Sequence, residues 1–166
     1  MQNLSADNAE CVEFIVNTYG DFLYRICYIL LKNESDAEDV VEETIIKYLE
    51  KKPALKDTDH IKAWLITVAK NKCKDLLRYQ KRHAHFDIDE MREVPRQTPD
   101  SGIFEILMTL PEKFRLVLVL HYVEEYKIDE IAKMIGKTPS AVKMRLQKGR
   151  RLLSEKYKKE VLSEDV

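Results

Sequence analysis

The sequence predicts an all-α protein of two small helical domains joined by a flexible linker, the C-terminal domain being a helix-turn-helix. Glycine and proline are scarce, with four and five among 166 residues, as expected of a mostly helical chain. Apolar residues recur with helical spacing before residue 79 and again after residue 104. The intervening residues lose this periodicity and contain two prolines and a glycine, which is typical of a linker. We therefore predict domains at 5–80 and 105–160 and a linker at 81–104.

The composition argues against several classes of protein. No run of about 18 apolar residues occurs, so no membrane span or membrane insertion is expected. The first ten residues lack a basic start and an apolar core, so we expect no secretory signal. Cys11, Cys27 and Cys73 are widely spaced and form no zinc pattern, which favours a reduced, cytoplasmic setting. We find no Gly-rich phosphate loop, HExxH motif or nucleophile elbow, and therefore predict no enzyme, metal or cofactor.

The first predicted helical face lies in residues 8–31. Its apolar side, spread over two expected helices, is formed by Val12, Ile15, Val16, Tyr19, Leu23, Ile26 and Leu30. The segment Asn33-Glu34-Ser35 interrupts this pattern. Ser35-Asp36-Ala37-Glu38 then has the form of a capping box, so we expect a new helix to begin there.

That next helix has an acidic outer face. Its core side is formed by Ala37, Val40, Val41, Thr44 and Tyr48, and its outer side by Asp39, Glu42, Glu43, Ile46 and Glu50. Residues 34–43 contain six acids and no base. An apolar anchor inside a charged rim is typical of a protein-binding surface. A solvated acidic face with one stray isoleucine would show the same pattern.

A third helix, Ile61 to Arg78, combines an apolar side with a polar, basic flank. Its predicted core residues are Ile61, Leu65, Val68, Ala69 and Leu76, and its flank carries Trp64, Thr67, Asn71, Lys74, Asp75 and Arg78. Residues 70–82 hold six basic residues and the single acid Asp75. Basic charge beside polar and aromatic groups suits single-stranded nucleic acid. Trp64 taken alone fits the core better than a stacking platform.

Residues 128–153 have the pattern of a helix-turn-helix. Ile128, Ile131, Ala132 and Ile135 form the apolar stripe of a short helix, and Val142, Leu146, Gly149 and Leu153 form that of a second. Gly136 is suited to end the first helix, while Thr138 can cap the second and Pro139 suits its first turn.

The outward side of the second helix is polar and basic. It carries Ser140, Lys143, Met144, Gln147, Lys148 and Arg151, with Arg145 and Arg150 on the flanks. Residues 137–159 hold nine basic residues and one acid, although the net charge of the chain is −1. This pattern indicates a recognition helix for the DNA major groove. A helical hairpin with a solvated lysine face is the simpler alternative.

Three segments in this order resemble the bacterial RNA polymerase sigma factors of the extracytoplasmic-function type (sigma-70 family, group 4). DAEDVVEETIIKYLEK (36–51) is similar to the segment that docks on the clamp helices of the largest subunit of core RNA polymerase. IKAWLITVAKNKCKDLLR (61–78) resembles the helix that opens and reads the minus-ten element. LPEKFRLVLVLHYVEEYKIDEIAKMIGKTPSAVKMRLQKGRRLL (110–153) resembles the reader of the minus-thirty-five element.

The resemblance implies a sigma factor that directs promoter-specific transcription initiation and assists promoter melting. Family members are often held silent by an anti-sigma factor that clasps both domains. By resemblance, the residues facing polymerase are Asp39, Glu42, Glu43 and Ile46. Those facing minus-ten DNA are Asn71, Lys74, Asp75 and Arg78, together with Lys56 and His60 of the preceding loop. Those facing minus-thirty-five DNA are Ser140, Lys143, Met144, Arg145, Lys148 and Arg150.

The chain departs from the family pattern at three positions. Glu42 replaces the usual Gln, Glu125 a frequent turn Gly, and Lys127 the usual capping Ser. Lysine is a poor N-cap, so we expect the helix after Lys127 to fray by a turn.

Two other classes of protein fit parts of the sequence. A stand-alone helix-turn-helix regulator with a sensor domain is disfavoured by the basic helix at 70–82 and by the lack of a ligand-sized apolar module. An anti-sigma or adaptor protein that uses only the acidic helix is disfavoured by the nine basic residues at 137–159.

Overall fold

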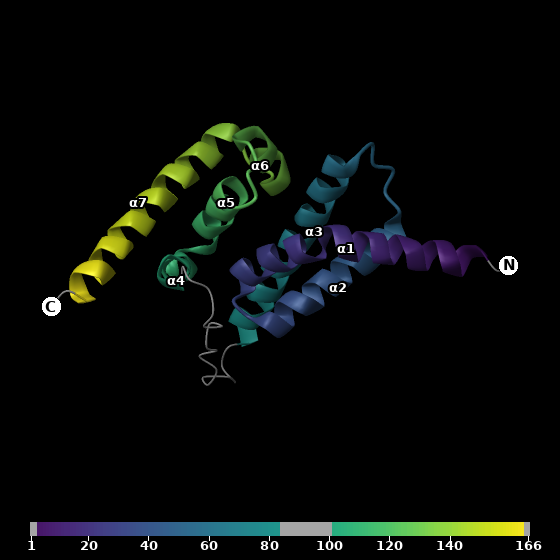
Figure 1. Cartoon of the computed structure of the whole chain (residues 1–166), viewed down its shortest axis with the longest axis horizontal. Coiled ribbons are helices and arrows are strands. Elements are labelled where there is room, and N and C mark those ends of the chain that lie inside the picture. The colour runs from purple at the N-terminus through teal and green to yellow at the C-terminus, as the bar shows by residue number, and fades with distance from the viewer. Residues whose placement is uncertain (1–2, 84–100, 165–166) are drawn as a thin grey trace. The chain divides into compact units, whose positions relative to one another are not determined.

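The computed structural model describes residues 3–83 and 101–164, and all regular structure within these ranges is α-helical (Figure 1). The helices form two compact units, the first with α1–α3 and the second with α4–α7. The predicted all-α class is confirmed. Most of the predicted linker, residues 84–100, lies outside the described ranges. None of the helices described in these two ranges is long and apolar enough to cross a membrane.

The first unit is a bundle of α1 (Asn3–Leu31), α2 (Glu34–Lys51) and α3 (Thr58–His83), each in contact with the other two. Its most deeply buried side chains are Ile15, Leu23, Ile26, Cys27, Ala37, Leu65, Ile66, Ala69 and Cys73. The prediction of two helices before residue 31 was wrong, because Gly20 lies inside one continuous helix, α1. Val16, predicted to be in the core, is 44% exposed.

The turn between α1 and α2 is closed by Asn33 and not by the predicted capping box at Ser35. Lys32 adopts a left-handed backbone, with φ of 57°. Asn33 Oδ1 accepts a hydrogen bond of 3.0 Å from the backbone N–H of Asp36, so Asn33 is the N-cap of α2. Asparagine caps as well as serine, and this cap satisfies a free N–H at the start of the helix.

Helix α3 is longer than predicted at both ends. Its buried residues are Leu65, Ile66, Ala69 and Cys73, whereas Ile61, Val68 and Leu76 are only half-buried. The core-facing side of α3 is therefore rotated slightly from the predicted one. At its C-terminal end, α3 continues to His83, beyond the predicted domain boundary at residue 80.

The second unit is built around α7 (Pro139–Glu164), which contacts α4 (Ser101–Thr109), α5 (Glu112–Tyr122) and α6 (Ile128–Ile135). Helix α4 begins within the predicted linker. Gly149 lets α5 and α7 approach closely, because a Cβ atom added there would lie 3.2 Å from Leu118 Cδ1. The central core residues are Ile106, Leu110, Val117, Leu120, Ile131, Val142 and Leu146.

The predicted helix-turn-helix is confirmed in α6 and α7. Gly136 ends α6 with φ of 64°, a left-handed conformation that glycine adopts without a Cβ clash. The backbone N–H of Ala141 donates to Thr138 Oγ1 over 3.2 Å, and α7 begins at Pro139 as expected.

The turn before α6 accommodates two of the three residues that depart from the family pattern, Glu125 and Lys127. Glu125 adopts φ of 58°, the conformation that glycine would adopt easily. Helix α6 nevertheless begins at Ile128, so the fraying expected from Lys127 was wrong. The reason is Glu130, whose carboxylate accepts a 2.7 Å hydrogen bond from the backbone N–H of Lys127.

Arg115 is a buried charge that fixes the connection between α4 and α5. Its Nη1 donates to the carbonyl oxygens of Met108 and Leu110, at 2.9 and 2.8 Å. Burial of the guanidinium lowers the pKa of Arg115. Because these carbonyls lie at and just after the end of α4, Arg115 satisfies acceptors that the helix leaves unpaired.

Candidate protein and nucleic-acid interfaces

Helix α2 presents an acidic outer face with an apolar residue in it. Asp39, Glu42 and Glu43 are exposed, and Ile46 is 46% exposed although its neighbour Ile45 is buried. The opposite side is closed to solvent, since Ala37 and Thr44 are fully buried and Thr44 Oγ1 donates to Val40 O over 2.6 Å. The structure thus brings the four predicted polymerase-facing residues onto one solvent-accessible surface.

Two polar contacts connect this acidic helix to α3. Lys72 Nζ lies 2.7 Å from a Glu43 carboxylate oxygen, and Gln80 Nε2 donates to Asp36 Oδ2 over 2.9 Å. Both contacts are on the surface, so each contributes little to stability. They connect the side chains of Glu43 and Asp36 directly to α3. No local pattern in the sequence indicates either pair.

The predicted strand-facing residues of α3 lie on its outer side. Asn71, Lys74, Asp75 and Arg78 are all exposed, and Arg78 Nη1 lies 3.8 Å from Asp75 Oδ1. An open groove of about 450 Å³ is lined by Asp75, Arg78, Lys81 and Arg82. The last two lie one turn beyond the predicted set and extend its positive charge to the end of the helix.

Trp64 does not form an open aromatic platform beside these residues. Its ring is half-buried and meets the ring of Tyr48 edge-on, with centroids 5.6 Å apart. The interpretation of Trp64 as a packing residue therefore agrees with the structure.

The loop before α3 is organised by Asp57. Its carboxylate accepts a 2.9 Å hydrogen bond from the backbone N–H of His60 and lies 2.7 Å from His60 Nδ1. The backbone N–H of His60, followed by its ring, lowers the pKa of Asp57. Asp57 thereby positions the imidazole at the start of α3, while His60 and Lys56 both remain exposed.

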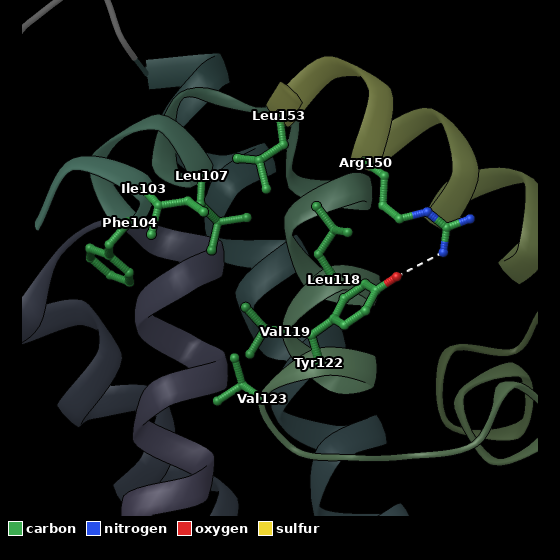
Figure 2. A pocket seen from close by; sticks show the side chains of 9 residues that line it. All are labelled: Ile103, Phe104, Leu107, Leu118, Val119, Tyr122, Val123, Arg150 and Leu153. Atoms are coloured by element: carbon green, nitrogen blue, oxygen red, sulfur yellow. Dashed lines mark hydrogen bonds between the residues drawn. The ribbon is translucent and has the colours of Figure 1, made fainter. Parts of the chain in front are cut away.

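The recognition helix α7 presents most, but not all, of its predicted contacts directly to solvent. Ser140, Lys143 and Lys148 are exposed, and Met144 is 70% exposed. Arg145 is half-buried on the flank of the helix. Arg150 Nη1 donates to Tyr122 Oη on α5 over 2.8 Å (Figure 2). Lys148 also reaches α5, since its Nζ lies 5.7 Å from the centroid of the Phe114 ring.

Arg150 also borders an apolar groove that the sequence did not predict (Figure 2). The groove has a volume of about 580 Å³ and lies between α4, α5 and α7. Tyr122 and Val123, on one side of it, are 54% and 60% exposed. Apart from Arg150 and Tyr122, its lining consists of Ile103, Phe104, Leu107, Leu118, Val119, Val123 and Leu153. An exposed apolar groove of this kind is typical of a protein-binding surface.

Comparison with known proteins places both units in one family. Sigma-70 region 2 matches residues 15–83, which lie in the first unit. Sigma-70 region 4 matches residues 102–153, which lie in the second.

Curated proteins and solved structures resemble the chain over most of its length. The sigma factor SigV of Bacillus subtilis is 29% identical and covers 98% of this chain and 100% of its own. The extracytoplasmic-function sigma factor SigW of the same organism is 26% identical, covering 87% of each chain. The sigma factor RpoE of Bartonella quintana, solved with the anti-sigma factor NepR, has a TM-score of 0.73 at 21% identity, covering 86% of this chain and 94% of its own. CnrH, solved with the cytosolic domain of CnrY, has a TM-score of 0.66 at 21% identity, covering 95% and 91%.

Proposed function

The chain belongs to the sigma-70 family as an RNA polymerase sigma factor of the extracytoplasmic-function type, and we propose that three surfaces of its two units carry out promoter recognition. It acts with core RNA polymerase in promoter-specific transcription initiation and is not itself an enzyme. The surfaces are the acidic face of α2, the basic flank of α3 and the recognition helix α7.

The acidic face of α2 is our candidate for the contact with core polymerase. Ile46 would insert as an apolar anchor, and Asp39, Glu42 and Glu43 would form its charged rim. Exposure of all four side chains on one face supports this assignment. The partner that fits is a surface with a small apolar depression and basic residues around it, for which the clamp helices of the largest subunit are our candidate.

The basic flank of α3 is our candidate for the minus-ten contact. Asn71 and Arg78 offer hydrogen-bond donors to bases and phosphates, and Lys74 adds charge. Asp75 would orient Arg78 through their ion pair. Lys56 and His60 would extend this surface at the start of α3, where Asp57 holds the imidazole in place.

Helix α7 is our candidate for the minus-thirty-five contact. Among its exposed residues, Ser140, Lys143, Met144 and Lys148 are our candidates for entering a major groove. Arg145 lies on one flank of the helix, and we propose that its guanidinium reaches a guanine edge from there. Because Arg150 donates to Tyr122, we assign it a phosphate contact in preference to base reading.

The apolar groove of the second unit is our candidate for a further protein contact. Both core polymerase and an anti-sigma factor are proteins that could place an apolar segment in it. The anti-sigma possibility is supported by RpoE of Bartonella quintana, which shares the fold and was solved with such a partner. We place the protein in the cytoplasm, where polymerase and promoter DNA are found.

The observation that carries the proposal is that the exposed acidic face and the two exposed basic faces lie in the two units that match sigma-70 regions 2 and 4. Run-off transcription with bacterial core polymerase on a promoter library tests it directly. Transcripts that start at a defined subset of promoters, and only when the chain is present, are expected. Core binding without such transcripts would contradict the proposal.

A variant with both Asn71→Ala and Arg78→Ala separates strand capture from duplex binding. It should reduce permanganate reactivity of thymines in the promoter bubble while leaving assembly with core polymerase unchanged. Normal bubble formation by this variant would remove α3 from the proposed minus-ten contact.

A further inference from the structure

An exposed aromatic pair lies at the end of α3, outside the residues assigned so far. The Tyr79 ring is 55% exposed and stacks on the His83 ring, with centroids 4.1 Å apart and planes inclined by 29°. His83 Nδ1 lies 2.8 Å from the Tyr79 carbonyl oxygen and must carry the hydrogen in this contact. The imidazole is therefore anchored to its own helix and supports the phenol ring from one side.

The surroundings of the pair are cationic. Asp75 and Arg82 lie four and three residues from Tyr79, which places them on adjoining parts of the helix surface. Arg82 lines the open groove together with Asp75, Arg78 and Lys81. Arg82 Nε also donates to Arg78 O over 3.3 Å, which directs its side chain along this part of the helix. Arg82 and Asp75 therefore flank the exposed ring along the helix, and they share a charged groove with Arg78 and Lys81.

Among the described residues of the first unit, the other exposed or partly exposed aromatic side chains lack this combination. Phe14 is 53% exposed but has Glu10 and Glu13 four residues and one residue before it, and its ring packs edge-on against Tyr19. Trp64 packs against Tyr48. A single exposed aromatic residue is ordinary on a protein surface. Tyr79 differs because an accessible ring, a second ring behind it and a cationic groove occur together.

We propose that Tyr79, supported by His83, is a stacking platform for an unpaired base of single-stranded DNA. Arg82, three residues along the helix from the ring, and Arg78, the residue before it, hold the phosphates on either side of that base. A cationic groove that follows the backbone, with an aromatic ring on which a base stacks, is the arrangement by which proteins bind single strands without reading sequence. The inference rests on the proposed strand-facing role of α3 and extends that surface to the end of the helix.

The test compares single-stranded and duplex DNA as probes for the full chain. Fluorescently labelled dT12 and the dT12·dA12 duplex are titrated and their anisotropy is measured. Tyr79→Ala should weaken dT12 binding by about five- to 150-fold, the effect of losing one stacked base, and leave duplex binding unchanged. Tyr79→Phe keeps the ring and should bind like the unaltered chain. Phe14→Ala, which removes an equally exposed ring from an acidic setting, should change neither affinity.

A covalent readout identifies the stacked residue itself. Irradiation of a dT12 analogue that contains 5-iodouracil should attach the oligonucleotide to Tyr79, and mass spectrometry of the peptides locates the link. A crosslink confined to other residues would overturn the assignment, as would equal losses on single strand and duplex for Tyr79→Ala. Absence of dT12 binding by the unaltered chain would also overturn it.

Arg78→Ala distinguishes failure of this inference from failure of the proposed function. If Arg78→Ala weakens dT12 binding and Tyr79→Ala does not, the platform is wrong and α3 still faces a single strand. If neither change weakens binding, the strand-facing role of α3 is wrong as well.

Discussion

Substitution of Ile46 by glutamate should abolish the binding of core RNA polymerase without unfolding the protein. Ile46 is the apolar residue of the acidic α2 face and is 46% exposed, so a carboxylate at this position can remain in water in the free protein. In a complex the same carboxylate would be driven against apolar surface. The substitution should therefore lower the affinity for polymerase without lowering the stability of the free protein.

The expected magnitude follows from the exposed fraction of the side chain. Complete burial of an isoleucine is worth about 1.5–3 kcal/mol, so covering the 46% that remains exposed contributes roughly 0.7–1.4 kcal/mol. Ile46→Ala should thus weaken binding by up to about tenfold. Ile46→Glu adds the desolvation of an unpaired carboxylate, which costs several kcal/mol, and should weaken binding by about a hundredfold or more.

The assay is a titration of the fluorescently labelled full chain with core polymerase, with far-ultraviolet circular dichroism as the measure of folding. Val16→Glu is the matched control, because Val16 is 44% exposed in the same unit but lies on α1. It should leave the affinity unchanged. An Ile46→Glu variant that binds core normally, or one that loses helical signal, would refute the reasoning.

Three further outcomes are expected. Gly149→Ala should gain about 1 kcal/mol of helix propensity but lose about 1–3 kcal/mol to overpacking, because the new methyl would lie 3.2 Å from a leucine carbon of α5. Amide hydrogen exchange should then show faster opening of α7. The control is Gly20→Ala, whose methyl meets nothing closer than 3.8 Å and which should slow the opening of α1. Slower exchange in α7 of the Gly149→Ala variant would contradict the close approach of α5 and α7. Arg145→Ala should reduce the preference for a matched over a scrambled minus-thirty-five duplex by about 1–3 kcal/mol. Lys158→Ala should weaken binding to both duplexes alike and lower the slope of the log binding constant against log salt concentration by about one unit. Equal losses on both duplexes for Arg145→Ala would mean that this residue only positions α7. Val123→Glu, at the exposed edge of the apolar groove, should weaken core binding if the groove contacts polymerase, and unchanged affinity would leave the anti-sigma factor as its partner.

The elements that the sequence predicted well depend on local signals. Gly136, Thr138 and Pro139 define the turn of the helix-turn-helix within four residues, and each adopts the expected role. Each preference follows from the backbone of the residue itself or from its nearest neighbours. The exposure of Ile46 also followed from spacing along one helix.

The features that the sequence did not predict depend on contacts between distant residues or on competing local signals. Asn33 and Ser35 are both residues that cap helices well, and the prediction of a capping box at Ser35 was wrong because Asn33 is the N-cap of α2. The direction of the Arg150 side chain depends on its hydrogen bond to Tyr122, which lies 28 residues away in the sequence. Tyr79 fell just beyond the predicted third helix, which was expected to end at Arg78 because the apolar periodicity ends there, although the helix itself continues to His83.

The arrangement of charge in the first unit predicts that its two proposed partners, polymerase and DNA, do not compete for one surface. The chain has a net charge of only −1, yet α2 exposes Asp39, Glu42 and Glu43 while α3 exposes Lys74, Arg78, Lys81 and Arg82. A phosphate backbone is repelled by the first set and attracted by the second, so DNA should approach α3 alone. The Glu43–Lys72 ion pair lies where the two faces meet and neutralises one charge of each sign there. Both faces belong to one bundle with a shared core, so the proposed docking of α2 on polymerase would also fix the position of α3, and the proposed strand-binding residues would reach the promoter already oriented.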